Sequence, residues 1–313
     1  MKIFKRIPKI IFVGLLLILS PDSLMADASD IYWSREGELA ADLVRKISPT
    51  VMPLTNKSNG KRQTGVIVDS PKGSFILTNY HLLGSTNDVV VAYFTDLKGA
   101  LEEFPIRFIK GDASLDLALF TAPGAESISR LLSMGYEIKT EKQGVPSRII
   151  RPGGDKEDSL SQKEFASEGD VLPGKNVMFL GFPLGKGLGY IIPQETIHFQ
   201  GARAKVNLPP QLAFKTPIAR FGKVASLPDG RNFFIDAMVN HGNSGSPVFL
   251  RTGAKTEGGA QLDYRFCGII RGFESDNVVF KGENGVEMSL PHNSGLALVI
   301  SIKAIAEFLS EFK

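Results

Sequence analysis

Ser244 lies between two small residues in the segment 240–250, NHGNSGSPVFL, which runs directly into an apolar stretch. Glycine, serine and asparagine are common turn formers, so this segment alone predicts only a bend before a strand. A serine hydroxyl becomes an effective nucleophile when an imidazole accepts its proton, a carboxylate orients the imidazole, and N–H donors stabilise the oxyanion. Other parts of the chain must supply these groups if Ser244 does chemistry.

Four histidines could act as the base: His81, His198, His241 and His292. His81 is the last residue of the run 73–81, GSFILTNYH, which we predict to be an apolar strand with a polar residue at its end. Asp116 is the one acid in the apolar stretch 115–119, LDLAL, which we predict to be a strand. A buried carboxylate is costly without a donor, and the imidazole N–H of His81 is a suitable one. His241 is so close to Ser244 in sequence that we interpret it as a loop residue at the substrate rim.

Glycines flank Ser244 at positions 242 and 245. A sharp turn there would let the backbone N–H groups of Gly242 and Ser244 converge on one point. Such a pair forms an oxyanion hole, in which one donor typically contributes about 3 kcal/mol of transition-state stabilisation.

The order His, Asp, Ser and the local sequences together resemble the chymotrypsin-like serine proteases, most closely the bacterial HtrA/Deg-type and related trypsin-like peptidases. The segments 64–81 (TGVIVDSPKGSFILTNYH), 112–120 (DASLDLALF) and 235–250 (IDAMVNHGNSGSPVFL) are similar to the family's histidine, aspartate and nucleophile segments. Weaker similarities are found in 172–185, 267–273 and 293–309. The resemblance covers roughly residues 38–312.

The resemblance implies a role for each matching residue. His81 would be the general base and acid, Asp116 its orienting carboxylate and Ser244 the nucleophile, with the amides of Gly242 and Ser244 as oxyanion donors. The backbone that would pair with a peptide substrate comprises Gly268, Ile269, Ile270, Arg271 and Gly272. Met238 would line the base of the primary specificity pocket, which predicts a preference for apolar over basic side chains. The implied reaction is acyl transfer on protein or peptide substrates, without a metal or organic cofactor.

Two departures from the family pattern stand out. Ser246 replaces the usual second glycine after the nucleophile, and its side chain could crowd the turn. We also expect none of the PDZ domains of HtrA proteins, so allosteric peptide sensing and cage assembly are not implied.

The spacing of strand-like runs and turn formers predicts an all-β protein of the barrel or sandwich type, in two halves of similar size. The resemblance implies that these halves are two six-stranded antiparallel β-barrels, and we expect helices at both ends. Residues 29–125 would hold an N-terminal helix and the first barrel, with His81 and Asp116. Residues 126–170, of which 151–170 is densely charged, would form a solvated connector or inserted loop, with a possible short helix at 128–135. Residues 171–313 would hold the second barrel, with Ser244, and a C-terminal helix whose apolar positions recur at helical spacing.

Residues 1–28 have the order of a secretory signal peptide: basic residues, the apolar run 10–19 and a small-residue cleavage pattern near Ala26 to Ala28. An uncleaved membrane anchor is the alternative. Cleavage would reduce the formal net charge from +3 to +1, so the mature chain gives no reason to expect nucleic-acid binding or stable membrane association. We expect a periplasmic or secreted protein. Cys267, the only cysteine, cannot form an intrachain disulfide, and we interpret it as a small core residue.

Other motifs are excluded by their spacing. The segment 181–189, GFPLGKGLG, lacks the Ser/Thr and the interval of a phosphate-binding loop, so we predict a hairpin loop. The Gly-Asn-Ser-Gly-Ser sequence is not the nucleophile elbow of α/β-hydrolases, because a strand rather than a helix comes next, and only His292, in an apparent loop, comes after the serine. A non-catalytic peptide-binding protein and an esterase on the same scaffold remain alternatives to a serine endopeptidase. The sequence does not determine the oligomeric state.

Overall fold

The computed structural model describes residues 38–45, 47–70, 73–95, 101–121, 137–140, 146–150, 160, 164–183, 195–199, 202–206, 217–256, 259–281 and 287–311. The predicted signal peptide, the possible helix at 128–135 and most of the segment 181–189 lie outside them. Residues 1–43 and 44–313 form separate compact units, and all the described strands belong to the second. Within the described residues, no helix is both long enough and apolar enough to cross a membrane.

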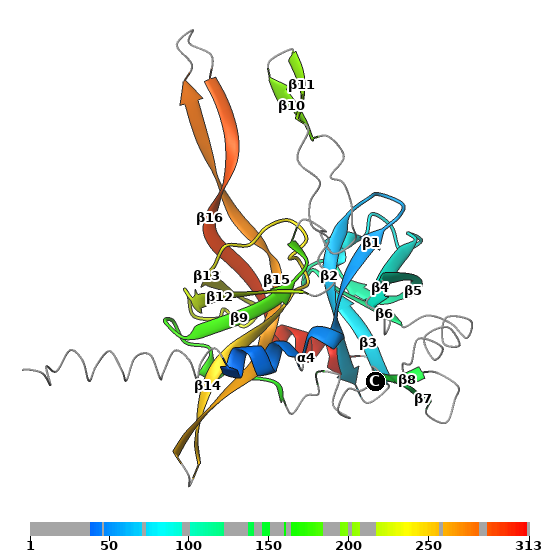
Figure 1. The fold of residues 1–313 in the computed structure, drawn as a ribbon, viewed down its shortest axis with the longest axis vertical. Coiled ribbons are helices and arrows are strands. Elements are labelled where there is room, and N and C mark those ends of the chain that lie inside the picture. Colours follow the sequence, from blue (N-terminus) through cyan, green and yellow to red (C-terminus); the bar gives the residue numbers. More distant parts are fainter. Residues whose placement is uncertain are drawn as a thin grey trace, which may run out of the picture. The chain divides into compact units, whose positions relative to one another are not determined.

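The first barrel is formed by strands β1 (Val51–Asn56), β2 (Arg62–Ser70), β3 (Gly73–Thr78), β4 (Val90–Thr95), β5 (Leu101–Asp112) and β6 (Leu117–Thr121). The sheet closes in the order β1-β2-β3-β6-β5-β4, with antiparallel pairs throughout (Figure 1). Leu54, Phe104 and Phe120 are fully buried at its centre. Pairing of β3 with β6 matches Thr78 with Ala118, so the end of β3 meets the start of β6.

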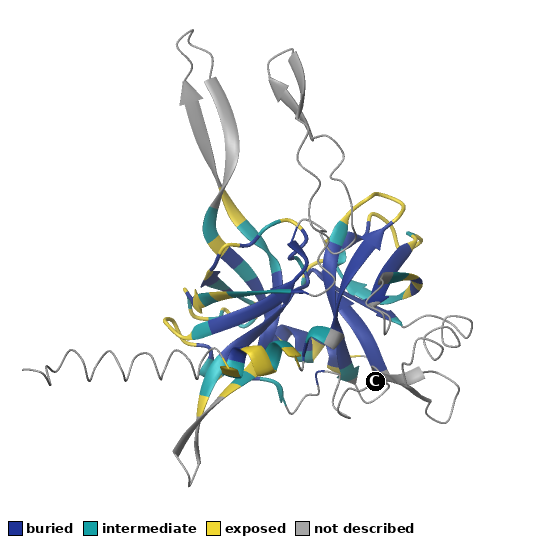
Figure 2. Ribbon diagram, viewed as in Figure 1, coloured by how far each residue is buried: buried dark blue, intermediate teal, exposed yellow. Residues whose placement is uncertain are grey.

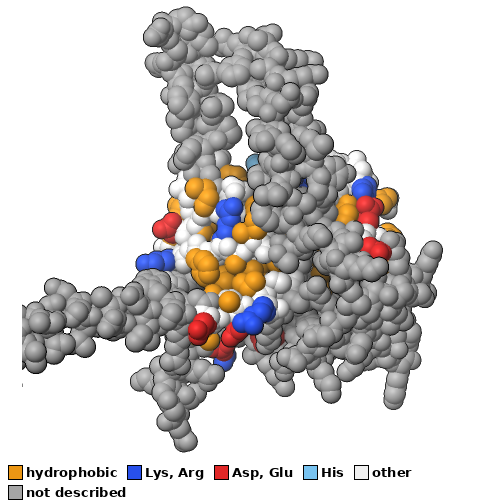
Figure 3. All heavy atoms as spheres, in the orientation of Figure 1, with side chains coloured by type: hydrophobic (Ala, Val, Ile, Leu, Met, Phe, Trp, Pro, Cys, Tyr) orange, Lys and Arg blue, Asp and Glu red, His pale blue; other side chains and the backbone are white. Residues whose placement is uncertain are grey.

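The second barrel is formed by strands β9 (Asn176–Gly181), β12 (Ile218–Val224), β13 (Asn232–Asp236), β14 (Pro247–Thr256), β15 (Gly259–Lys281) and β16 (Glu287–Ser301). It closes in the order β12-β13-β16-β15-β14-β9. The core contains Phe179, Phe233 and Val248, and Figure 2 shows buried residues along the strands of both barrels. The prediction of two six-stranded antiparallel barrels is therefore confirmed. Figure 3 shows hydrophobic side chains exposed in the region where β9, β12 and β13 lie in Figure 1.

Helices are present at both predicted places. Residues 38–45 are helical. Helix α4 (Ile302–Ser310) follows β16 directly, and the side chain of Ser301 caps it by accepting a hydrogen bond from the N–H of Ala304 at 3.3 Å. Its apolar positions, including Ile305 and Phe308, are buried, as their spacing predicts.

The predicted connector contains more regular structure than expected. Strands β7 (Glu137–Thr140) and β8 (Pro146–Ile150) pair as a two-stranded sheet in the predicted connector, and β10 (Glu195–Phe199) pairs with β11 (Ala202–Val206). Leu160 is buried beside β2, where it exchanges backbone hydrogen bonds with Ile67 and Asp69. The densely charged 151–170 stretch therefore includes a residue anchored to the first barrel. His292 belongs to strand β16, not to the loop expected from the neighbouring proline.

Candidate active site

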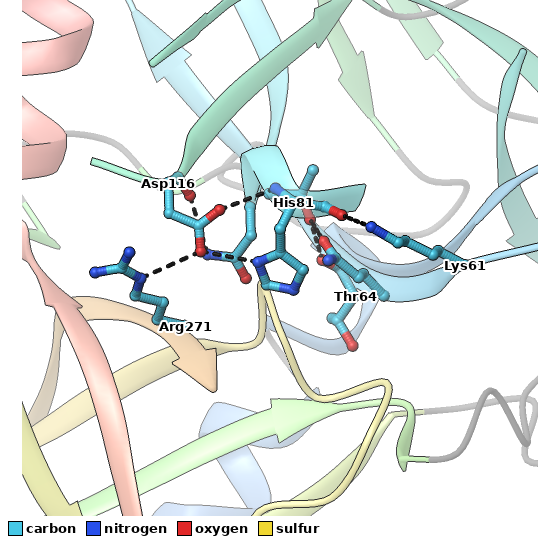
Figure 4. Close-up of polar contacts among 8 residues, drawn as sticks. Lys61, Thr64, His81, Asp116 and Arg271 are labelled. Atoms are coloured by element: carbon cyan, nitrogen blue, oxygen red, sulfur yellow. Dashed lines mark hydrogen bonds and ion pairs between the residues drawn. The ribbon is translucent and has the colours of Figure 1, made fainter. Parts of the chain in front are cut away.

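The predicted base and its carboxylate are in direct contact at the end of the first barrel. His81 lies in the 3-10 turn η2 (Tyr80–Leu82), immediately after β3. Its Nδ1 is 2.8 Å from Asp116 Oδ2, and its backbone N–H donates to Asp116 Oδ1 at 2.9 Å (Figure 4). The two carboxylate oxygens of Asp116 thus bind the ring and the backbone of His81, which fixes the position of the imidazole relative to the backbone. His81 is half-exposed, with 45% of its side chain accessible, whereas Asp116 is buried.

Asp116 lies in the turn before β6, not inside a strand as its apolar neighbours predicted. Its φ of 58° is in the left-handed region, which aspartate tolerates better than most residues. Its carbonyl accepts hydrogen bonds from the N–H of Tyr80 at 3.1 Å and from Asn79 Nδ2 at 3.2 Å. The backbone and the side chain of Asp116 are therefore both bound to the segment that carries His81.

Asp112 stabilises the start of the turn that presents Asp116. Its Oδ1 accepts from the hydroxyl and the N–H of Ser114 and from the N–H of Leu115, at 2.7 to 3.0 Å. These hydrogen bonds, first that of the Ser114 hydroxyl, hold the pKa of Asp112 below its usual value. An ionised Asp112 thus stabilises the loop geometry that places the orienting carboxylate.

Ser244 lies in the second of two consecutive tight turns, at residues 240–243 and 243–246. The N–H of Asn243 donates to Asn240 at 3.0 Å, and the N–H of Ser246 donates to Asn243 at 2.9 Å. The third residue of each turn is a glycine with positive φ, 92° at position 242 and 83° at position 245. This is the pattern of type II turns, which explains the need for glycine at both positions. The N–H groups of Gly242 and Ser244 have no hydrogen-bond partner among the described residues, so both can donate to a ligand.

Thr64, on β2 of the first barrel, holds these turns from across the barrel interface. Its N–H donates to the carbonyl of Ser244 and its hydroxyl donates to the carbonyl of Gly242, both at 2.8 Å. The hydroxyl also accepts from the N–H of Phe182 at 3.1 Å, so one buried side chain joins the nucleophile turn to the end of β9. A Cβ at Gly245 would collide with the carbonyl of Thr64, which adds a packing reason for that glycine.

Ser246 is accommodated by a glycine on the neighbouring strand. It is fully buried, and its side chain occupies the space next to Gly181, where a Cβ would collide with Ser246 Oγ. Its backbone still makes the turn hydrogen bond to Asn243. The departure from the family pattern therefore leaves the turn intact, although Ser246 Oγ is buried without a hydrogen-bond partner among the described residues.

The proposed substrate strand is narrower than the range 268–272. Gly268 and Ile269 pair with β14 on one side and β16 on the other. Ile270 donates to the carbonyl of Ser246 at 2.9 Å and accepts from the N–H of Gly245 at 2.8 Å. The backbone of Gly268, Ile269 and Ile270 is thus already used within the barrel. On the side of β14, no described strand pairs with β15 beyond Ile270, so the available edge begins at Arg271 and Gly272.

A pocket of about 410 Å³ opens beside the His81–Asp116 pair. Its lining residues from the first barrel are Tyr80, His81, Ala113 and Asp116, and those from the second are Arg271, Gly272, Phe273, Glu274 and Leu298. Arg271 Nε lies 3.4 Å from Asp116 Oδ2. Sequence reasoning assigned only a backbone role to Arg271 and did not single out Thr64 or Gly181. For Thr64, the only available signal was its place as a small polar residue in the otherwise apolar strand pattern of residues 64–68.

Three other residues considered in the sequence analysis, Met238, His241 and Cys267, make no described contact with His81 or Asp116. Met238 is 56% exposed, and its carbonyl accepts from Arg220 Nη1 at 2.8 Å; its contact with substrate stays a prediction. The ring of His241 packs edge-on against Phe273, with centroids 5.4 Å apart, which fits a loop residue rather than a base. Cys267 is a buried free thiol, as expected, and burial raises its pKa. The described residues contain no cluster of metal-binding side chains.

Ser244 and His81 are not hydrogen-bonded to one another among the described contacts. Ser244 is partly exposed on its turn, and Thr64 ties that turn to the barrel that carries His81. Catalytic hydrogen bonds are often long in ligand-free proteins and tighten when substrate binds, so this geometry is compatible with a triad.

Comparisons with known proteins found a solved structure and a family of sequences that are similar to this chain. A solved structure described as "HtrA-type protease AlgWS227A with tripeptide" matches 87% of this chain and 62% of its own, with 16% sequence identity and a TM-score of 0.45. This chain therefore spans less than two thirds of that protein. No curated protein sequence matches significantly. The sequence model of a family described as "Trypsin-like peptidase domain" matches residues 63–254, which is more than half of the 313 residues. This chain, with its two closed six-stranded barrels, belongs to the trypsin-like peptidase family.

Proposed function

We propose that this chain is a serine endopeptidase that uses His81, Asp116 and Ser244 as a catalytic triad. The observation that carries the proposal is the double hydrogen bond between His81 and Asp116, at 2.8 and 2.9 Å. It fixes Nδ1 as the donor to the carboxylate and leaves Nε2 as the nitrogen able to accept a proton from serine. The free N–H groups of Gly242 and Ser244 supply the second requirement, donors for an oxyanion.

The proposed reaction has two acyl-transfer steps. Ser244 Oγ attacks the carbonyl carbon of a peptide bond while its proton passes to His81 Nε2, and the N–H groups of Gly242 and Ser244 stabilise the oxyanion. The C–N bond then breaks as His81 returns this proton to the leaving amine, which leaves an ester on Ser244. His81 next deprotonates a water molecule that attacks the ester, and the acid product departs as the proton returns to Ser244. Asp116 stays ionised and stabilises the imidazolium in both steps.

A non-catalytic peptide-binding protein is the second candidate, because His81 and Ser244 share no hydrogen bond among the described contacts. The two functions are separated by an active-site probe. The protein beginning at residue 29 is incubated with a fluorophosphonate at neutral pH, alongside Ser244→Ala and His81→Ala variants. We expect covalent labelling at Ser244 that is lost in the first variant and strongly reduced in the second. Absence of labelling in folded protein would contradict catalysis, and turnover of esters without turnover of peptides would favour an esterase.

We also propose that the protein is exported to the periplasm or secreted. The support is the basic, apolar and small-residue order of residues 1–28. The mass of the N-terminal peptide of the mature protein tests this: a start near residue 29 supports export with cleavage, and an intact N-terminus supports the anchored alternative.

A further inference from the structure

The side chain of Arg271 is placed by an irregularity in strand β15. The pairing of β15 with β16 runs from Ile270 with Val299 directly to Gly272 with Leu298, so Arg271 is the extra residue of a β-bulge. Bulges of this kind change the direction in which a side chain points and are frequent beside active sites. Here the bulge directs Arg271 across the barrel interface to within 3.4 Å of Asp116.

The guanidinium of Arg271 has N–H donors that no described residue uses. Asp116 Oδ2, its partner, already accepts from His81 Nδ1 at 2.8 Å, and Arg271 reaches it only through Nε. The two terminal amino groups make no hydrogen bond or ion pair with any described residue, and in Figure 4 they point away from Asp116 and His81. The side chain is 35% accessible and lines the 410 Å³ pocket. A fixed guanidinium with a free pair of N–H donors is suited to bind a planar carboxylate through two parallel hydrogen bonds.

From this arrangement we propose that the pocket is a subsite for an acidic side chain of the substrate, with Arg271 as the residue that selects it. The inference rests on the proposed function, because it assumes that a peptide lies along the free edge of β15 that begins at Arg271. A peptide paired there presents alternate side chains to opposite faces, and one of them meets the pocket beside His81. Tyr80, Phe273 and Leu298 in the lining provide apolar contact for the methylene groups of a glutamate.

Glu274 limits the number of acidic substrate residues that the pocket can accept. It also lines the pocket and is exposed, but it makes no ion pair with Arg271 among the described contacts. A substrate carboxylate therefore finds the two terminal amino groups of Arg271 without a partner among the described residues, while Glu274 disfavours a second negative charge nearby. We expect a single acidic residue close to the scissile bond rather than an acidic stretch.

Binding to a catalytically silenced protein tests the subsite separately from the reaction. Ser244→Ala protein is panned against a random hexapeptide library, and selected peptides are remade as pairs that differ only by Glu or Gln. We expect the Glu member to bind about tenfold more tightly by fluorescence anisotropy, the effect of one partly exposed charged hydrogen-bonded pair. Adding Arg271→Gln is expected to abolish the difference. Arg265→Gln is the matched control, because Arg265 lies on the same strand, is 44% accessible and is absent from the pocket lining.

Three results would overturn the proposal: equal binding of the Glu and Gln peptides, a preference that survives Arg271→Gln, or no selected peptide that binds. A fourth is an equal loss of binding for both members of each pair in Arg271→Gln, which would show that Arg271 only positions Asp116. Because these measurements use Ser244→Ala protein, acidic selection is detected even if the unmodified protein fails to react with the fluorophosphonate. Loss of catalysis and loss of the subsite are thus separate outcomes.

Discussion

Replacing Thr64 with valine removes one hydroxyl from the interface between the two barrels and keeps the branched shape of the side chain. In the structure this hydroxyl donates to the carbonyl of Gly242 at 2.8 Å and accepts from the N–H of Phe182 at 3.1 Å. Thr64 and Gly242 are buried, and Phe182 is 3% exposed, so water cannot readily replace the lost contacts. The change therefore tests whether the first barrel shapes the oxyanion turn of the second.

Two effects of different size are expected from the loss of these contacts. Each of the two buried groups left without a partner costs about 1–3 kcal/mol, so we expect the free energy of unfolding to fall by about 2–6 kcal/mol. The carbonyl of Gly242 also loses its anchor, which frees the turn that aims the N–H groups of Gly242 and Ser244. Loss of one oxyanion donor costs up to about 10²–10³ in kcat, and a loosened donor should cost less, about 10–100-fold. KM should change little, because the donors act mainly on the charge that forms in the transition state.

The assay is steady-state hydrolysis of a peptide substrate, at a temperature where circular dichroism shows every variant folded. Thr64→Ser retains the hydroxyl and should keep kcat within a few-fold of the unmodified protein. Thr50→Val is the stability control: Thr50 is also fully buried and donates one hydrogen bond, to the carbonyl of Ile47 at 2.8 Å, away from the site. If Thr64→Val lowers stability as Thr50→Val does and leaves kcat unchanged, the proposed role of the Thr64 hydroxyl is wrong.

Three further predictions concern the packing and charge around the site. Gly181→Ala should lower the free energy of unfolding by about 2 kcal/mol or more, because the added Cβ collides with Ser246 Oγ. Ser246→Gly in the same chain should recover part of this loss. A double-mutant cycle measured by urea denaturation that shows no coupling between the two positions would contradict this contact. The lowered pKa of Asp112 means that its stabilising effect is complete above the unfolded value of 3.8 and is lost as pH falls through the lower folded value. Asp112→Asn should therefore cost less than about 1 kcal/mol at neutral pH, and this cost should shrink as the pH falls below 3.8; an equal cost across that range would count against the ionised form. Cys267 should react with a thiol reagent only after unfolding, since it is fully buried; rapid reaction of the native protein would contradict its core position.

The local sequence contained the information for most of the strands and for the choice of His81, Asp116 and Ser244 as candidate site residues. Apolar runs and turn formers predicted the strands of both halves, because a strand with one buried face imposes a period of two on its sequence. That these strands close into two barrels was implied by the family resemblance. The helical spacing after position 301 predicted α4, where Ser301 provides the cap. Asp116 was expected within a strand because its neighbours are apolar; the structure places it in a turn, where hydrogen bonds from Asn79 and Tyr80 support a left-handed backbone.

By itself the sequence determined the candidate triad of His81, Asp116 and Ser244 and predicted a turn rich in glycine around Ser244, since turn chemistry and strand periodicity are local properties. Only the tertiary structure decided how those residues are held. Thr64 reaches the nucleophile turn, and Arg271 reaches Asp116, from segments far away in the chain. Ser246 fits because Gly181 on another strand leaves room for it. Such contacts depend on barrel closure and strand register, which bring together side chains that no local pattern relates.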